Sequence, residues 1–127
     1  MNNRISAKER GLIKGAIRRV FSRSDLRRAV IASVRVPGHH DVSRPRVKKW
    51  SKCGKCGRLT PEYLMECDHI SPIVPIDKTL EEMSWDTVID RTWCLQNNLQ
   101  AICKDCHSVK TKEEREARKA FKKGKLK

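Results

Sequence analysis

Two pairs of cysteines with the same spacing constrain the fold of this chain more than any other feature. Cys53 and Cys56 form the first pair, and Cys103 and Cys106 form the second. Two intervening residues allow a tight turn to direct both sulfurs of a pair at one ion, and structural Zn²⁺ prefers four such thiolates in a tetrahedron. The sequence therefore predicts one structural Zn²⁺ that joins two distant parts of the chain.

Other uses of the cysteines are less favoured. A pair of redox-active dithiols would need a thioredoxin-like pattern around them, and there is none. Three disulfides in a secreted protein would leave the metal-ligand spacing unexplained, and the first residues begin no apolar signal run. Cys67 and Cys94 remain, and we expect both to be buried free thiols. With no segment of membrane-spanning length, we expect an intracellular protein in a reducing compartment and no membrane partner.

The charge of the chain is arranged in three blocks. The chain has 29 Lys and Arg and 15 Asp and Glu, which give a net charge of +14. Residues 1–50 hold 14 basic and 3 acidic residues, residues 51–106 hold 6 basic and 9 acidic residues, and residues 107–127 hold 9 basic and 3 acidic residues. Basic flanks around a mildly acidic centre suit a protein whose basic ends hold a metal-binding centre against a polyanion. Each Lys or Arg that contacts a phosphate releases a counterion, which favours binding. Nucleic acid is the predicted partner, and a merely solvated basic surface is the alternative.

The hydrophobic pattern predicts a small α+β protein with an N-terminal helical arm. Residues 6–9 have the form of a capping box, and apolar residues then recur at helical spacing to about residue 21. A second helix should begin after Ser22 or Ser24 and end near Pro37, which makes residues 1–46 a basic helical arm. An amphipathic arm packed on the main domain is favoured over a helix-turn-helix.

The main domain should span residues 47–127. We expect short strands over 47–52 and 64–70, a helical insertion near 79–91 that starts at a second capping box, a turn and short strand over 97–102, and a last helix over about 104–122.

Several short motifs between and beside the cysteine pairs carry residues typical of catalysis. In chain order they read Cys53-Gly-Lys-Cys56, Asp68-His69-Ile70-Ser71-Pro72, Asn98-Leu99-Gln100 and Cys103-Lys-Asp-Cys106-His107-Ser-Val-Lys110-Thr111. This order resembles that of the HNH endonucleases, which have the ββα-metal fold. The resemblance covers about residues 50–112 and is particularly to the small, stand-alone, zinc-braced HNH proteins of tailed bacteriophages. It implies a ββα-metal core braced by the four-cysteine Zn²⁺ site.

The resemblance also implies a metal-dependent endonuclease that hydrolyses phosphodiester bonds of double-stranded DNA, nicking one strand or cutting both. His69 would be the general base that takes a proton from water, a task suited to imidazole near neutral pH. Asp68 and His107 would bind a catalytic Mg²⁺ or Mn²⁺ and leave positions open for phosphate and water. Asn98 would tie the loop to backbone groups and orient the strand that carries His69; Asn97 is the less favoured candidate.

Each of these assignments has a structural alternative. His69 could be a packed structural histidine. His107 could be a neighbour of the Zn²⁺ site, or a helix residue whose hydrogen bonds serve only the fold. Adjacent residues of a regular strand point to opposite faces, so Asp68 and His69 can share a site only at a twist or a strand end.

Basic residues of the last helix are the candidates for DNA contacts, namely Lys110, Arg115, Arg118 and Lys119. A solvated helix face is the alternative for each of them. Phosphate contacts carry no sequence information, so target preference would have to come from the arm or the insertion.

One HNH site cuts one strand, so double-strand cleavage would need a homodimer or a second binding event. Other implied partners are phage or host DNA-processing proteins, in the cytoplasm of a bacterium or of a bacterial host. The alternative function is a non-catalytic zinc-knuckle protein that only binds nucleic acid.

Overall fold

The computed structural model describes residues 4–125 and has the small α+β architecture that the sequence predicts. Its helices and strands are α1 (Ala7–Phe21), α2 (Asp25–Ala32), β1 (Trp50–Lys52), β2 (Leu59–Pro61), β3 (Met65–His69), α3 (Trp85–Thr92), β4 (Leu99–Cys103) and α4 (Lys104–Lys125). Short 3₁₀ turns lie at Glu62–Leu64, Leu80–Glu82 and Gln96–Asn98. Within the described part of the chain, β1 pairs with β2 and β3 pairs with β4, both antiparallel.

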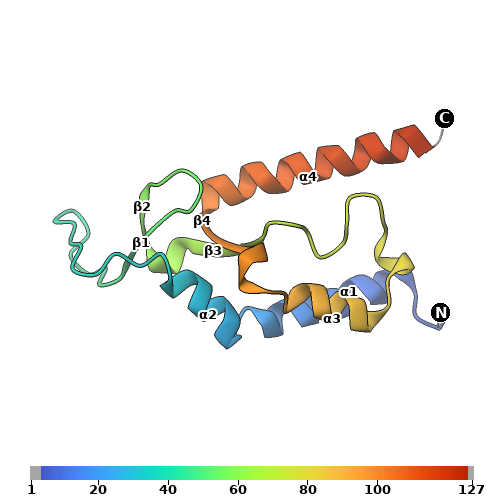
Figure 1. The fold of residues 1–127 in the computed structure, drawn as a ribbon, viewed down its shortest axis with the longest axis horizontal. Helices are drawn as coiled ribbons and strands as arrows, with labels where there is room; N and C mark the ends of the chain where they lie inside the picture. The colour runs from blue at the N-terminus through green and yellow to red at the C-terminus, as the bar shows by residue number, and fades with distance from the viewer. Residues whose placement is uncertain (1–3, 126–127) are drawn as a thin grey trace.

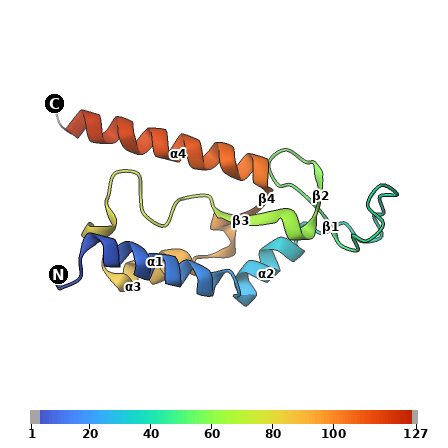
Figure 2. The ribbon, with the colours of Figure 1, turned by 180° about the vertical axis from the view of Figure 1, so that it is seen from behind.

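The β3–β4 pair and the helix that follows it form the centre of the molecule. The two strands pair over their full length, with Asp68 opposite Gln100 and His69 opposite Leu99. Strand β4 continues directly into α4, which packs against both strands. In Figure 1, α4 lies along one side of the molecule and α1 and α3 along the other. The segment that follows β3 runs between these sides, as the reverse view in Figure 2 also shows.

Both helices of the arm begin at the serines that the sequence indicates. Ser6 caps α1 in a complete capping box with Glu9, and the side chain of Ser24 accepts a hydrogen bond from Arg27 N to cap α2. The prediction that the second helix ends near Pro37 is wrong, because α2 ends at Ala32. The chain beyond it pairs with β1 instead: Lys52 N donates to the carbonyl of residue 34 at 2.9 Å.

The arm and the central strands share one hydrophobic core. Its buried members are Phe21, Val30 and Ile31 from the arm and Met65, Leu99 and Ala101 from β3 and β4. Burying apolar side chains of this size contributes roughly 1.5–3 kcal/mol each. The arm therefore packs on the main domain, and its first helix ends beside the strand that carries His69.

The insertion near 79–91 is not one continuous helix. Thr79 and Glu82 do form the capping box, but only the 3₁₀ turn Leu80–Glu82 follows it. Met83 is extended and buried at 5% exposure, and Ser84 then caps α3 anew. Burial of Met83 beside Val88 outweighs the local helical preference, so that the segment breaks at this point.

The edge pair β1–β2 is only partly visible in the sequence. The strand expected over 47–52 is limited to Trp50–Lys52. Its partner β2 has no periodic signal of its own because it is three residues long and ends in Pro61. The turn between these strands carries Cys53 and Cys56.

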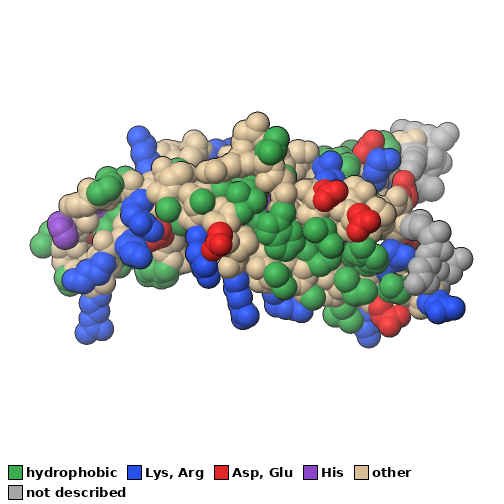
Figure 3. Space-filling view, turned by 60° about the horizontal axis from the view of Figure 1, so that its bottom comes forward, with side chains coloured by type: hydrophobic (Ala, Val, Ile, Leu, Met, Phe, Trp, Pro, Cys, Tyr) green, Lys and Arg blue, Asp and Glu red, His purple; other side chains and the backbone are tan. Residues whose placement is uncertain are grey.

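Helix α1 also presents apolar side chains to solvent. Figure 3 shows hydrophobic side chains gathered on the face where α1 and α3 run. A groove between the two helices is lined by Ile13, Ala16, Ile17, Val20, Ile89 and Trp93. Ile17 both lines this groove and packs against the buried cluster of Ile73, Val74, Met83 and Val88, so the groove adjoins the core.

The turn between β1 and β2 depends on Gly54, and its substitution by alanine is a sensitive test of how this turn is seated. Gly54 N donates to Ala101 O at 2.8 Å, and a Cβ on Gly54 would lie 3.0 Å from the same oxygen. We expect Gly54→Ala to lower the free energy of unfolding by about 1–3 kcal/mol through overpacking. Gly11→Ala is the matched control: nothing lies within 4 Å of the new Cβ in α1, and a gain of about 0.5–1 kcal/mol is expected. Denaturant titration measures both, and an unchanged Gly54→Ala variant would contradict the close approach to β4.

Candidate functional site

The four cysteines of the two Cys-x-x-Cys pairs converge at the junction of β1–β2, β4 and α4. Their sulfur atoms all lie within 4.8 Å of one another. The Sγ atoms of Cys56 and Cys103 are 3.9 Å apart. A tetrahedral Zn²⁺ with Zn–S bonds of about 2.3 Å separates its sulfurs by about 3.8 Å. The cluster could therefore hold a metal ion such as Zn²⁺, and its all-sulfur donor set suits that metal.

Backbone amides prepare one of these sulfurs for metal binding. The Sγ of Cys53 accepts hydrogen bonds from the amides of Lys55 and Cys56, each at 3.4 Å, and of Cys103 at 3.3 Å. Burial by itself raises the pKa of Cys53, but these donors outweigh it and lower the pKa to about 6. Hydrogen bonds with the neighbouring thiols, Cys103 foremost, raise the pKa of Cys106 to about 12. The cluster retains protons that a divalent cation would displace.

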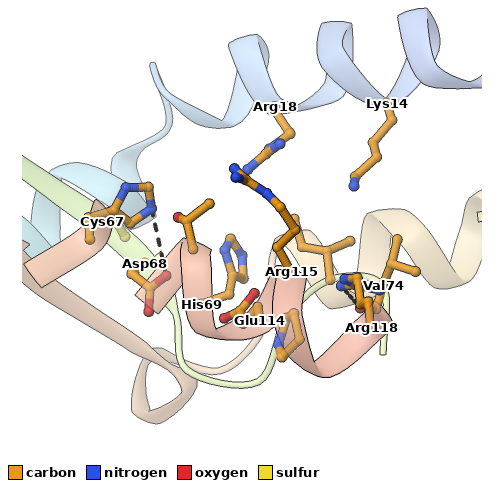
Figure 4. A pocket seen from close by; sticks show the side chains of 13 residues that line it. Lys14, Arg18, Cys67, Asp68, His69, Val74, Glu114, Arg115 and Arg118 are labelled. Carbon is orange, nitrogen blue, oxygen red and sulfur yellow. Dashed lines mark hydrogen bonds and ion pairs between the residues drawn. The ribbon is translucent and has the colours of Figure 1, made fainter. Parts of the chain in front are cut away.

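A second constellation lies in a cleft of about 320 Å³ between α1 and α4 (Figure 4). Asp68, His69 and His107 all line this cleft. His69 is the last residue of β3, so the strict alternation of a regular strand no longer separates it from Asp68. The fold thus brings together in one cleft three of the four side chains that were predicted to be catalytic; Asn98 is not among the lining residues.

Asp68 and His107 leave room for a cation between them. Asp68 is buried, and its Oδ2 accepts hydrogen bonds from Gln100 Nε2 at 2.9 Å and from Lys110 Nζ at 3.1 Å. Its Oδ1 lies 3.8 Å from His107 Nε2, which is too long for a hydrogen bond. Two ligand atoms that each lie about 2.1 Å from an ion can be up to about 4.2 Å apart. The pair therefore fits a divalent ion bound from both sides.

Glu66 sets the tautomer of His107. Its Oε2 lies 2.5 Å from His107 Nδ1. A carboxylate accepts, so Nδ1 carries the proton, and the lone pair of Nε2 faces Asp68. Metal-binding histidines commonly donate their other ring N–H to a carboxylate in this way, which fixes the ring and raises its basicity as a ligand.

The ring of His69 is held by a backbone carbonyl. His69 Nε2 lies 2.8 Å from Thr92 O, and a carbonyl can only accept, so Nε2 carries the proton. The remaining lone pair belongs to Nδ1, for which the described residues provide no hydrogen-bond partner. Phe21 packs on the ring with centroids 5.1 Å apart. The arrangement leaves one ring nitrogen able to accept a proton.

Asn98 ties the loop after β3 to the start of β4. Its Oδ1 accepts from Ser71 N at 2.8 Å, and its Nδ2 donates to Ser71 O at 3.3 Å. The backbone adds a bond from Ile70 N to Asn98 O at 2.8 Å. Asn98 does not line the cleft, so its contacts position the end of β3 from outside the cleft.

Lys110 points into the protein. Its ammonium donates to His69 O at 2.9 Å and also bonds Asp68 and Glu114. Burial lowers the pKa of Lys110, but the hydrogen bonds to Glu114 and Asp68 outweigh it and raise the pKa. With these three oxygens around it, Lys110 links α4 to the end of β3 beside the cleft.

The other basic residues predicted to contact DNA are placed differently from one another. Arg118 donates to Val74 O at 2.5 Å and to Pro75 O at 3.1 Å, which joins α4 to the segment after β3. Arg115 lines the cleft, and the described residues offer it no acidic partner. Lys119 lies on an adjoining groove.

Four residues of this region were not predicted from the sequence. Glu66 could have been found, because it is two residues before Asp68 on the same face of β3. Gln100 requires the β3–β4 register, which no local pattern specifies. Lys14 and Arg18 of α1 line the cleft from the side opposite α4. They look like ordinary basic residues of an amphipathic helix until the arm is docked.

The chain has no significant match among known protein families, curated proteins or solved structures. None of the helices in the described residues is both long and apolar enough to cross a membrane.

Proposed function

We propose that this protein is a metal-dependent DNA endonuclease of the HNH type, which hydrolyses phosphodiester bonds with His69 as general base. The observation that carries the proposal is the meeting of Asp68, His69 and His107 in one cleft. Two further features support it. Asp68 and His69 lie on β3, which pairs with β4; β4 runs directly into α4, which carries His107, so these elements form a β–β–α unit, and the four-cysteine cluster lies at the junction of β4 and α4.

The hydrogen bonds of the site suit the reaction. With Nε2 of His69 committed to Thr92 O, Nδ1 can take a proton from water as it attacks phosphorus. Asp68 Oδ1 and His107 Nε2 would hold a divalent cation such as Mg²⁺ or Mn²⁺. When bound, this cation would neutralise charge on the phosphate and on the departing 3′ oxygen. Gln100, Lys110 and Glu66 would keep the two ligands oriented before the ion arrives.

Relaxation of supercoiled plasmid DNA is the direct test. The protein, with Zn²⁺ bound to its cysteines, is incubated with the plasmid in Mg²⁺, in Mn²⁺ and in a weak chelator that spares the Zn²⁺. We expect nicked circles to form only with added divalent ion. End labelling should find 5′-phosphate and 3′-hydroxyl termini, because water attacks phosphorus and the 3′ oxygen departs.

Two outcomes would overturn the proposal. Binding of DNA with no cleavage in any divalent ion would favour the non-catalytic zinc-knuckle protein. Cleavage that persists unchanged in Asp68→Ala, whose Zn²⁺ content and fold match the wild type, would place the chemistry elsewhere.

A further inference from the structure

One wall of the cleft comes from outside the β–β–α unit. Lys14 and Arg18 lie one helical turn apart on α1, and both line the cleft opposite Arg115 of α4. Figure 4 shows both side chains extending from α1 into the cleft, with Arg18 next to Arg115. The arm thus brings positive charge to the same cavity whose floor holds Asp68 and His69.

The positive charge of this wall is not neutralised by the protein. The cleft is lined by four cations, Lys14, Arg18, Arg115 and Arg118, and by two carboxylates, Asp68 and Glu114. Both carboxylates already bond the ammonium of Lys110. Arg118 donates to backbone carbonyls. Among the described residues, Lys14, Arg18 and Arg115 therefore face the cavity without an anionic partner.

Lys14 experiences this imbalance directly. Burial lowers the pKa of its ammonium, and the nearby guanidinium groups of Arg18 and Arg118 lower it further. Bringing like charges together at a half-buried position is costly. An anion bound between these cations would relieve their repulsion. The arrangement therefore suits the binding of a negatively charged ligand and does not stabilise the ligand-free protein.

The cavity limits what can enter. A volume of about 320 Å³ is at the small end of the range for ligand sites. A cavity of this volume does not enclose a duplex. A segment of one sugar–phosphate backbone is an anion of the right kind, with repeated charges that could reach both the cleft floor and the α1 wall.

We propose that Lys14 and Arg18 of the arm, with Arg115 of α4, form a second phosphate site that holds the substrate strand beside the scissile phosphate. The arm would then be part of the substrate cleft and not only a packing element. This assignment rests on the proposed function in taking the anion to be the DNA backbone, and it lies outside the region that carries the HNH resemblance.

The salt dependence of DNA binding tests this site without requiring catalysis. Binding of a fluorescent duplex oligonucleotide is measured by anisotropy at several salt concentrations, in a His69→Ala background that prevents cleavage. Each phosphate contact adds about 0.9 to the slope of log K against log salt concentration. We expect Lys14→Gln with Arg18→Gln to reduce this slope by about 2. The fold should be unaffected, because the substitutions remove repelling charges.

A pair on the same helix provides the matched control. Lys8→Gln with Arg19→Gln removes the same charge from exposed positions of α1 that do not line the cleft. We expect a slope change less than half as large. Restoring the charge with Lys14→Arg and Arg18→Lys should restore most of the slope, and this variant also shows that any loss is not due to misfolding.

The outcomes separate this site from the nuclease proposal. Equal slope changes for the two pairs would overturn the phosphate site, whether or not the protein cleaves DNA. A selective change for the cleft pair in a protein that cuts no DNA in any divalent ion would support the site and reject the nuclease. No slope change for the cleft pair, with normal cleavage by the wild type, would reject the site alone.

Discussion

Replacing His69 by alanine is expected to lower the rate of plasmid nicking by about 10²–10⁴-fold, the usual contribution of a positioned general base. The substitution removes the ring whose Nε2 is held by Thr92 O and whose Nδ1 would accept the proton. It also removes the packing of the ring on Phe21, which costs the fold about 0.5–1.5 kcal/mol. Because that loss is small, the variant should remain folded.

Nicking rates under saturating Mg²⁺ and thermal unfolding curves check both parts of this expectation. His40→Ala is the matched control, since this histidine is exposed in the loop before β1. It should nick at the wild-type rate. A His69→Ala variant that retains activity within a few-fold of wild type, at equal metal content, would remove His69 from the mechanism.

Cys103→Ser is expected to cause the largest loss of stability. Cys103 is 1% exposed, and its Sγ lies in the cluster at the point where β4 becomes α4. Structural Zn²⁺ in small domains binds with about 10–16 kcal/mol of apparent free energy, whereas a domain of this kind is stable by only about 5–15 kcal/mol in total. Loss of the ion would thus remove an amount comparable to the whole free energy of unfolding.

Zinc content by elemental analysis and circular dichroism during heating are the measurements. We expect less than one Zn²⁺ per chain in Cys103→Ser and a broad, early unfolding transition. A strong chelator should have the same effect on the wild type. Cys94→Ser is the control, because Cys94 lies outside the cluster and its sulfur only accepts a long contact from Asn98 Nδ2, at 3.6 Å. A metal-free Cys103→Ser variant as stable as the wild type would show that the cluster is not a structural metal site.

Local signals account for most of the helices, for β3 and β4, and in part for β1. Ser6 and Ser24 each satisfy free N–H groups at a helix start within three residues, so short-range chemistry suffices to place α1 and α2 at their beginnings. The same reasoning fails where long-range contacts compete. Helix α2 stops at Ala32 because the following backbone pairs with β1, and the segment 79–91 breaks because Met83 is buried in the core.

The cysteine spacing, by itself, predicted a contact between distant parts of the chain, since four thiolates at metal-binding intervals have few other stable uses. The motifs likewise named Asp68, His69 and His107 without the structure. Only the tertiary structure decided how the hydrogen bonds orient His69 and Asp68, because Thr92 and Gln100 act through space and leave no joint pattern with them in the sequence. It also decided that α1 faces the cleft: burial of Phe21 beneath His69 sets the rotation of the helix and thereby the direction of Lys14 and Arg18.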